Sequence, residues 1–352
     1  MNNPLSGIVN PLLNWYAGHA RVLPWREEPT PYRVWISEIM LQQTRVEAAK
    51  SYFERFTAEL PDITTLAQAP EAQLLKLWEG LGYYSRVRNL HKAAQLVVSD
   101  YGGRLPSEPE ELIRLPGIGA YTAGAIASIA YGKSSPAVDG NVLRVIARVT
   151  ASTENISDTA VKRGIEQQLK AIYPAEHAGD FTQALMELGA LICLPNGSPK
   201  CGDCPLQALC AAHKQGIEEE LPVKQAKKAR KIEHRTVFLI LCREKAAIQK
   251  RPDKGLLAGL WEFPSADGVL SPQQTENLLK TWGLVPLNIA RLPPSNHIFT
   301  HIEWHMNGFL VSVADTSDHV RLVWAQRGEL LETYTLPTAF KTFFSRFLEA
   351  EE

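Results

Sequence analysis

Two glycines separated by one apolar residue, in Leu115-Pro116-Gly117-Ile118-Gly119, constrain the fold of this chain more than any other feature. Before them, Ser107-Glu108-Pro109-Glu110 is typical of a helix start, with serine as the N-cap and acids in the first turn. After them, the small residues of the segment 121–131 predict a helix that packs closely against its neighbours. Because glycine tolerates unusual backbone angles and close contacts, we expect two helices joined by a tight hairpin.

The hairpin at Gly117 and Gly119 is suited to holding phosphate groups. Backbone N–H groups at the start of a helix bind anions, because several donors and the helix dipole point at the same place. A Gly-x-Gly pair alone is more often a simple turn, but its position between two helices indicates a helix-hairpin-helix motif over residues 108–131. Such contacts position DNA without reading its sequence, so both glycines are candidate DNA-binding residues.

Two carboxylates are candidates for acid–base chemistry. Asp139 precedes Gly140-Asn141 and an apolar helix, so it is placed as an N-cap, and the helix dipole would keep it ionised. An ionised aspartate can stabilise positive charge that develops on a substrate. Glu38 lies in the segment 31–50, where apolar residues recur at helical spacing. It is either exposed on a polar face or buried with a raised pKa, which would make it a general acid; periodicity leaves both alternatives open.

Four of the five cysteines are close together in the sequence. They are separated by seven, two and five residues and are Cys193, Cys201, Cys204 and Cys210. One Cys-x2-Cys pair with two more cysteines nearby predicts a metal site. A zinc site with four thiolates usually has two such pairs, and a [4Fe–4S] cluster also takes four thiolates, so spacing alone does not decide between them. The fifth, Cys242, ends an apolar strand and is expected to be buried.

The chain changes character after about residue 225. Residues 1–225 have helical periodicity, whereas the segments 236–242 and 309–313 are expected strands within a second part, residues 236–349. Between the two parts, residues 226–235 are basic and poor in large apolar side chains, which predicts a linker. We therefore expect a multidomain chain, with an all-α domain followed by an α+β domain.

The overall charge does not itself predict a nucleic-acid partner, since it is −1 with a pI near 6.8. Basic residues are nevertheless grouped between Arg86 and Arg104 and between Lys224 and Lys231. A protein whose net charge is near zero can therefore still have a basic surface. Each group is equally well explained as a solvated surface. No stretch is long enough to span a bilayer, and residues 1–13 lack the pattern of a signal peptide. We therefore expect a cytoplasmic protein with a metal site rather than disulfides.

These motifs together resemble the MutY-type adenine DNA glycosylases of the helix-hairpin-helix superfamily, which carry an iron–sulfur loop. The resemblance covers most of the chain and is highly specific. Besides the hairpin and the cysteines, it rests on Leu23-Pro24-Trp25-Arg26, Ser37-Glu38-Ile39-Met40-Leu41-Gln42-Gln43-Thr44, Gly80-Leu81-Gly82-Tyr83-Tyr84-Ser85-Arg86, Val138-Asp139-Gly140-Asn141-Val142, Gly259-Leu260-Trp261-Glu262-Phe263-Pro264 and His297-Ile298-Phe299-Thr300-His301.

The resemblance implies a catalytic role for four residues. Glu38 would protonate N7 of adenine, and Asp139 would stabilise the oxocarbenium-like sugar, either electrostatically or through a transient bond. Tyr121 and Asn141 would support this chemistry, and water would complete hydrolysis to an abasic site. Endonuclease III-type relatives place a lysine at the position of Tyr121 and form a Schiff base, so we expect a monofunctional glycosylase without strong strand cleavage.

The resemblance also implies contacts with DNA and a cofactor. A mispaired adenine would be extruded into a pocket, while wedge residues fill the gap. The wedge residues would be Gln43 and Tyr83, and the pocket residues Trp25, Arg26 and Gln183. The four clustered cysteines would hold a [4Fe–4S] cluster in the loop 193–210. Related proteins usually have six residues between the first two cysteines, and the extra residue here is expected to be absorbed by the loop Asn196-Gly197-Ser198-Pro199.

The second part resembles a Nudix-like domain without Nudix hydrolase chemistry. Between residues 266 and 285 only Asp267 and Glu276 are acidic, which is too few for the magnesium-binding box. The resemblance instead implies recognition of 8-oxoguanine opposite the adenine, through Phe299, Thr300 and His301. The implied partner is double-stranded DNA with adenine opposite 8-oxoguanine or guanine, bound by a monomer. An endonuclease III-like glycosylase/lyase, a non-catalytic lesion-binding protein and a nucleotide-pool Nudix hydrolase are the alternatives.

Overall fold

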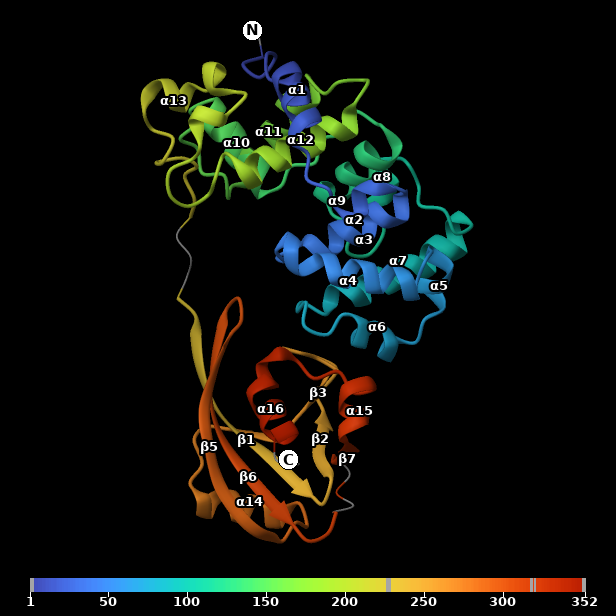
Figure 1. Ribbon diagram of the computed structural model, residues 1–352, viewed down its shortest axis with the longest axis vertical. Helices are drawn as coiled ribbons and strands as arrows, with labels where there is room; N and C mark the ends of the chain where they lie inside the picture. The colour runs from blue at the N-terminus through green and yellow to red at the C-terminus, as the bar shows by residue number, and fades with distance from the viewer. Residues whose placement is uncertain (1–2, 226–228, 317–318, 320, 350–352) are drawn as a thin grey trace. The chain divides into compact units, whose positions relative to one another are not determined.

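The computed structural model describes residues 3–225, 229–316, 319 and 321–349, and it divides the chain into two compact units (Figure 1). The first unit comprises Met1–Ala69 and Arg88–Ala226, and the second comprises Pro70–Val87 and Lys227–Glu352. In the described part of the chain, no helix combines the length and apolar character needed to cross a membrane.

The first unit is helical, as expected for the first part of the chain. Its core forms where α1, α10 and α12 pack together and bury side chains such as Leu12, Val145 and Phe181. The helices of this unit are α1 (Val9–His19), α2 (Pro24–Glu27), α3 (Pro31–Leu41), α4 (Val46–Glu59), α5 (Ile63–Gln68), α7 (Ser85–Tyr101, from Arg88 onward), α8 (Pro109–Leu112), α9 (Ala120–Ala125), the π-helix η1 (Ile126–Ala130), α10 (Gly140–Val149), α11 (Thr159–Lys170), α12 (Ala178–Leu191), the 3-10 helices η2 (Cys201–Asp203) and η3 (Gln207–Leu209), and α13 (Ala211–Gln215).

Local boundaries differ from the predictions at two places in this unit. The segment 31–50 is not one helix, because α3 ends at Leu41 and Gln43 adopts a left-handed backbone, with a φ of 60°, before α4 begins. Ser107 is not the N-cap of the helix before the hairpin. That position belongs to Glu108, because Pro109 is the first helical residue, and the Ser107 hydroxyl contacts the Glu108 carboxylate instead.

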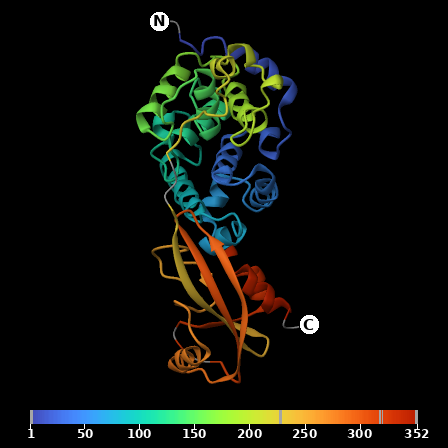
Figure 2. The ribbon, with the colours of Figure 1, turned by 90° about the vertical axis from the view of Figure 1, so that its left-hand side faces the viewer.

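The second unit is built on a mixed sheet with the strand order β3-β2-β1-β6-β5, in which β4 also pairs with β1 and β7 with β2. Figure 2 shows the long strands of this sheet in yellow and orange. Only β1 and β6 run parallel among the pairs described. Alternate residues of β1 enter two separate cores, with Val237 and Leu239 in one and Phe238 and Ile240 in the other, so both faces are covered. The strands are β1 (Lys231–Cys242), β2 (Lys245–Lys250), β3 (Trp261–Glu262), β4 (Ser265–Asp267), β5 (Pro286–Ile298), β6 (Ile302–Val313) and β7 (Val323–Gln326), and the helices are α6 (Glu71–Leu77), α14 (Pro272–Thr281), α15 (Arg327–Glu332), η4 (Thr338–Phe340) and α16 (Lys341–Glu349).

The predicted linker, residues 226–235, is shorter than its composition indicated. Lys231 already pairs with Ile302, and this parallel ladder continues to Leu241 and Ser312. The five residues from Lys231 to Arg235 therefore belong to β1, because hydrogen bonding to β6 outweighs their polar composition. Residues 226–228 of the predicted linker lie outside the described residues.

A short segment from the first part of the sequence belongs to the second unit. In Pro70–Val87, the Lys76 ammonium group donates to the carbonyl oxygens of Leu330 at 3.1 Å and Tyr334 at 3.2 Å. The Glu79 carboxylate accepts from the backbone N–H of Leu336 at 2.7 Å. Residues 1–225 were predicted to form one helical domain, so the assignment of residues 70–87 to the second unit was not expected.

Candidate active site

One cavity in the first unit gathers most of the predicted catalytic and pocket residues. It is lined by side chains from α2, α3, α9 and α12 and from the turn that precedes α10. The predicted residues found there are Trp25, Arg26, Glu38, Gln43, Tyr121, Asp139, Asn141 and Gln183. The fold therefore brings together residues that are more than a hundred positions apart in the sequence.

Glu38 is buried, which decides between the two alternatives that periodicity left open. The residue is only 6% exposed, and burial raises the pKa of its carboxyl group to about 7. The Tyr121 hydroxyl donates a hydrogen bond of 2.5 Å to Glu38 Oε2 and lowers this pKa, whereas the nearby Asp139 raises it. Glu38 can consequently carry a proton near neutral pH, as a general acid must.

Asp139 is the N-cap of α10, as predicted. Its carboxylate accepts from the backbone N–H of Val142 at 2.8 Å and from the Asn141 side-chain amide at 2.7 Å. Burial raises the pKa of Asp139, against the direction expected from the helix terminus, while these hydrogen bonds and Arg144 lower it. Glu38 and Asp139 thus occupy different environments, one apolar with a single hydroxyl donor and the other rich in donors.

Asn141 is held in place by a buried arginine. Arg144 donates to Asn141 Oδ1 at 2.9 Å, to the Gly189 carbonyl oxygen at 2.8 Å and, through Nε, to the Cys193 carbonyl oxygen at 2.7 Å. Helix α12 approaches so closely at Gly189 that an added Cβ would lie 2.5 Å from Asn141 Cβ. The side chain beside Asp139 is therefore fixed from two directions, and Arg144 connects the cavity with the first cysteine.

The sequence reasoning missed a charged group in the same cavity. Glu187 is 1% exposed and accepts two hydrogen bonds from the Arg21 guanidinium, at 2.6 and 2.8 Å, one from the Arg21 backbone N–H at 3.2 Å, and one from Arg26 at 3.1 Å. Burial alone would raise the pKa of Glu187, but these arginines bring it below its ordinary value. One signal was present in the sequence, because Glu187 follows Gln183 by four positions and so shares its helix face.

The predicted hairpin residues lie outside this cavity. Gly117 has a φ of +79°, which favours glycine, and an added Cβ would lie 2.8 Å from the Asn89 Cβ. Gly119 has an ordinary φ of −95° and is the N-cap of α9. The first hydrogen bond of this helix runs from the N–H of Ala123 to the Gly119 carbonyl oxygen. The backbone N–H groups that precede Ala123 therefore take no part in the hydrogen bonds within α9.

The remaining predicted DNA contacts lie in the second unit. Phe299, Thr300 and His301 form the turn between β5 and β6. Thr300 and His301 are exposed, whereas the Phe299 ring packs edge-on against Trp304 with ring centroids 4.9 Å apart. The Tyr83 and Thr300 hydroxyl groups are 2.8 Å apart and hydrogen-bonded. The structure therefore pairs two residues that the sequence had assigned to different roles.

The four clustered cysteines line a second, smaller cavity of the first unit. The pKa of Cys201 and that of Cys204 are both raised to about 11. Burial is the largest cause, and nearby negative groups, which include the other thiolates, raise them further. The Arg148 guanidinium donates to Cys193 Sγ at 3.2 Å. Four thiol groups that line one cavity fit a metal centre. Four adjacent thiolates repel one another unless a bound metal ion compensates their negative charge. Cys242 is buried in a core of the second unit, as predicted.

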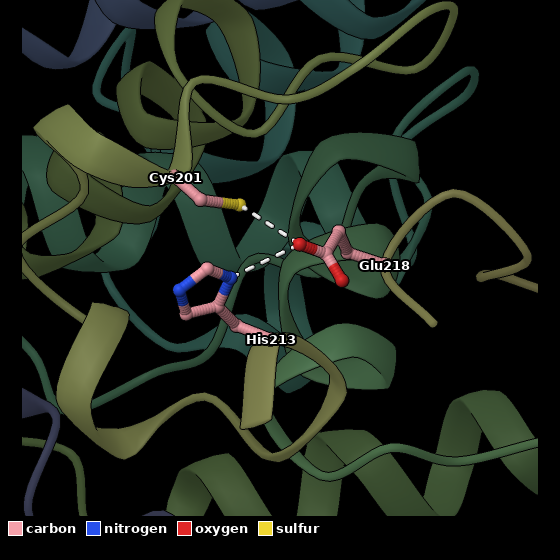
Figure 3. A group of neighbouring side chains, drawn as sticks. All are labelled: Cys201, His213 and Glu218. Atoms are coloured by element: carbon pink, nitrogen blue, oxygen red, sulfur yellow. Dashed lines mark hydrogen bonds and ion pairs between the residues drawn. The ribbon is translucent and has the colours of Figure 1, made fainter. Parts of the chain in front are cut away.

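Two polar side chains lie beside one thiol of this cavity and line it too. The sulfur of Cys201 lies 3.8 Å from Glu218 Oε1, and the same oxygen lies 3.0 Å from His213 Nδ1 (Figure 3). The Glu218 carboxylate is one of the negative groups that raise the pKa of Cys201.

Comparison with known proteins defines the class. Residues 36–171 match the family described as HhH-GPD superfamily base excision DNA repair protein, and residues 236–346 match the NUDIX domain. Among solved structures, the chain is similar to a thermostable thymine-DNA glycosylase, with a TM-score of 0.56 and 28% identity over 61% of this chain and 98% of that one. Endonuclease III in a non-covalent DNA complex shares the fold, with a TM-score of 0.53, 23% identity and coverage of 62% and 99%. The chain is thus a helix-hairpin-helix base excision repair glycosylase with an added Nudix-like domain.

Curated relatives narrow the class to a family. An adenine DNA glycosylase of Buchnera aphidicola subsp. Schizaphis graminum is 34% identical over 305 residues, which cover 86% of this chain and 87% of the relative. The mouse adenine DNA glycosylase is 35% identical, with coverage of 83% and 68%, and the human one is 36% identical, with coverage of 83% and 64%. The chain belongs to the adenine DNA glycosylase family.

Proposed function

We propose that this protein hydrolyses the N-glycosidic bond of adenine mispaired with 8-oxoguanine or guanine in double-stranded DNA. The observation that carries the proposal is a buried Glu38 with a pKa near 7 in the same cavity as a hydrogen-bonded Asp139. The products are free adenine and an abasic site. The protein acts as a cytoplasmic monomer on DNA.

The two carboxylates divide the chemistry between them. Once adenine is extruded from the helix, Glu38 donates its proton to N7 and makes the base a better leaving group. Asp139 then stabilises the positive charge on the sugar, and a water molecule completes the hydrolysis, as in glycoside hydrolysis with two carboxyl groups. Tyr121 keeps the Glu38 carboxyl group in position, and Asn141 does the same for Asp139.

The cavity walls supply recognition of the extruded base. Trp25, Arg26 and Gln183 line the cavity, and the Glu187 carboxylate bound to Arg21 and Arg26 adds a fixed polar edge that can hydrogen-bond an aminopurine. Because its hydrogen bonds to the arginines are already formed, this edge loses little freedom when a base enters.

Gln43 and Tyr83 are proposed as the wedge residues in the DNA. Both side chains are exposed, and both residues have left-handed backbones, with φ of 60° and 49°. A non-glycine residue in this region costs free energy and is enriched at functional sites. The strain supports a role in which each side chain is held outward, toward the base stack.

The other contacts divide between the two parts of the chain. Gly117 and Gly119 would bind the phosphate backbone, while Phe299, Thr300 and His301 would contact the 8-oxoguanine opposite the adenine. This division corresponds to a glycosylase domain over residues 1–225 and a lesion-recognition domain over residues 236–349.

The cysteine cavity is proposed to hold a [4Fe–4S] cluster through Cys193, Cys201, Cys204 and Cys210. When bound, the cluster would supply four strong iron–thiolate bonds that cross-link the loop 193–210. Arg148 would support it by its hydrogen bond to Cys193 Sγ, and Arg144 would transmit the position of this loop to Asn141.

Single-turnover excision on labelled duplexes tests the proposal. Adenine is placed opposite 8-oxoguanine, guanine or thymine, and each reaction is read with and without alkali. We expect strand scission only after alkali, fastest opposite 8-oxoguanine, because Tyr121 replaces the lysine of the lyases. Scission without alkali, together with a borohydride-trapped adduct, would favour the glycosylase/lyase alternative. Binding without excision would leave a non-catalytic lesion-binding protein.

A further inference from the structure

Three buried hydroxyl groups are hydrogen-bonded in series next to the catalytic cavity, and we call them the hydroxyl network. They belong to Tyr173, which follows α11, to Thr182 of α12 and to Ser128 of the π-helix η1, and these residues are 8%, 1% and 0% exposed. The Tyr173 and Thr182 hydroxyl groups are hydrogen-bonded to each other, and the Thr182 hydroxyl donates to Ser128 Oγ at 2.7 Å. The Ser128 hydroxyl donates in turn to the Gly124 carbonyl oxygen of α9, also at 2.7 Å.

The hydroxyl network adjoins residues that line the cavity. Ser128 precedes Ile129 and Thr182 precedes Gln183, and both of the following residues line the cavity. The network ends on α9, the helix that carries Tyr121. A displacement of the network would therefore move three parts of the cavity wall together.

The loop that carries Asp139 contacts the same network. A Cβ added at Gly124 would clash with the Pro136 carbonyl oxygen, so α9 and this loop are in direct backbone contact. Burial raises the pKa of Tyr173 to about 12, and the Ala137 backbone, which hydrogen-bonds to its hydroxyl group, opposes this rise. The Tyr173 hydroxyl group thus stays protonated at neutral pH and contacts the loop two residues before Asp139.

The hydrogens of the network can be arranged in only one way along the series. Each hydroxyl group has a single hydrogen to donate. Because Ser128 donates its hydrogen to a carbonyl oxygen, the hydrogen between Thr182 and Ser128 comes from Thr182, which is also 3.0 Å from the Ala178 carbonyl oxygen. The hydrogen between Tyr173 and Thr182 then comes from Tyr173. Removal of one hydroxyl group would leave a buried neighbour without its donor or its acceptor.

We propose that Tyr173, Thr182 and Ser128 are positioning residues for Asp139, which fix its loop against α9, η1 and α12. This inference rests on the proposed function, since it gives the three hydroxyl groups a part in adenine excision. A fully satisfied buried network suits the task, because its hydrogen bonds fix direction as well as distance and make the surrounding core rigid. Catalysis depends steeply on such placement, and a displacement of about 1 Å can cost ~10²-fold in rate.

The test removes one hydroxyl group at a time from the full-length protein. Thr182→Val and Tyr173→Phe should lower the single-turnover rate of adenine excision by ~10-fold, as expected for a displacement of less than 1 Å, while binding of mismatched DNA is retained. The loss of rate at low pH, where Asp139 becomes protonated, should begin at higher pH in both variants. A displaced loop weakens the hydrogen bonds that oppose the rise of the Asp139 pKa on burial. Thr182→Ser keeps a hydroxyl group and should restore both the rate and the pH profile.

Matched controls separate positioning from a general loss of stability. Thr57→Val removes a hydroxyl group that donates to the carbonyl oxygen four residues earlier in α4, a contact that Thr182 also makes in α12. Tyr32→Phe removes a buried tyrosine hydroxyl group that donates to the Leu60 carbonyl oxygen at 2.6 Å. Both controls should lower the melting temperature without moving the pH profile of excision.

Hydrogen exchange tests the same inference without relying on activity. The Val142 backbone N–H donates to Asp139 at 2.8 Å, so it should exchange faster in Thr182→Val and Tyr173→Phe than in the wild type and the controls. Unchanged exchange, rate and pH profile in both folded variants would overturn the proposal, as would equal changes in the controls. If Thr182→Val does not fold, Tyr173→Phe, which removes a single oxygen atom, decides alone. A wild-type protein that excises no adenine would instead count against the proposed function, and hydrogen exchange would still decide whether the network holds the loop.

Discussion

Both units bury a glutamate, but they do so in opposite ways. In the second unit, Glu262 is 3% exposed, forms an ion pair with Arg251 and accepts a hydrogen bond of 2.8 Å from Gln249. In the first unit, Glu38 is 6% exposed, lines a cavity and receives its one described hydrogen bond from a neutral hydroxyl group, that of Tyr121. The Glu262 carboxylate has a cationic partner, whereas burial of Glu38 without an ion pair raises its pKa and favours its protonated form. A buried acid becomes a candidate catalyst when its charge is left uncompensated next to a cavity.

The strongest test of this comparison removes each glutamate in turn. Glu38→Gln keeps the shape of the side chain but removes the acidic proton, so excision should fall by ~10²–10⁴-fold, the usual contribution of general acid catalysis. Binding to mismatched DNA should persist. Single-turnover rates and a binding titration measure the two effects, with the exposed Glu47→Gln as the matched control on α4.

Glu262→Gln should instead affect stability. It leaves the partly buried Arg251 guanidinium without its counter-ion, which costs up to about 3–5 kcal/mol of the free energy of unfolding. Excision by the folded protein should stay within a few-fold of wild type. Full activity in Glu38→Gln, or a catalytic defect of similar size in folded Glu262→Gln, would remove the distinction between the two sites.

The cysteines give a second contrast between the units. Cys204→Ala should abolish the visible absorbance and most of the iron, because the cluster loses one of its four thiolates and the remaining groups cannot replace it. Cys242→Ala, in a core of the second unit, should retain both and lose only packing. Metal analysis of the two purified variants measures this difference. Equal iron loss in both, without unfolding, would refute the assignment of the four ligands.

Features determined by local chemistry were predictable from the sequence. Asp139 was expected to be an N-cap and is one, since the geometry needs only the helix that follows it. The turn at Gly117 requires a left-handed residue and has one. The four cysteines were predicted to form one metal site because a Cys-x2-Cys pair has two more cysteines nearby in the sequence, and they line one cavity.

Features determined by tertiary packing were not predictable in the same way. The burial of Glu38 depends on α9 and α12, which follow it by more than eighty residues, so periodicity within α3 could not decide it. Glu187 is held by Arg21, a residue 166 positions away in the sequence, so the sequence did not reveal this contact. The pairing of Lys231 with Ile302 likewise extended β1 into residues whose composition predicted a linker.

The pH dependence of excision is the next, smaller test. Glu38 must be protonated to act as an acid, and its pKa is raised to about 7, so the rate should fall ~10-fold per unit above this pH. The rate should also fall at low pH, because protonation of Asp139, whose pKa is raised as well, removes the negative charge that stabilises the sugar. The same raised pKa means that the contribution of Glu38 to stability is fully present below its unfolded value, near 4.5, and is lost as the pH rises through about 7. Pre-steady-state excision and thermal unfolding across this range measure both effects.

Tyr121→Phe sharpens this test. The Tyr121 hydroxyl donates to the Glu38 carboxylate and lowers its pKa, so its removal should raise that pKa. A hydrogen bond to a charged group is worth ~1.5–3 kcal/mol, which corresponds to a shift of roughly one to two pH units in the alkaline limb. A limb that stays in place, or moves to lower pH, would show that another group controls the rate.

The smallest expected effect lies in the second unit, where the turn between β5 and β6 should influence selection rather than chemistry. Thr300→Ala removes a hydroxyl that is hydrogen-bonded to Tyr83 and exposed for contact with a base. A neutral hydrogen bond contributes ~0.5–1.5 kcal/mol, so the preference for adenine opposite 8-oxoguanine over adenine opposite guanine should fall by ~2–10-fold. Ser295→Ala is the control, because its hydroxyl on the same strand pair contacts Thr342 instead. Since Glu38 and Asp139 are untouched, excision opposite guanine should be nearly unchanged in both variants. An unaltered rate ratio in Thr300→Ala would remove Thr300 from the reading of the opposite base. The contrast between a catalytic and a selective unit would then depend on Phe299 and His301 alone.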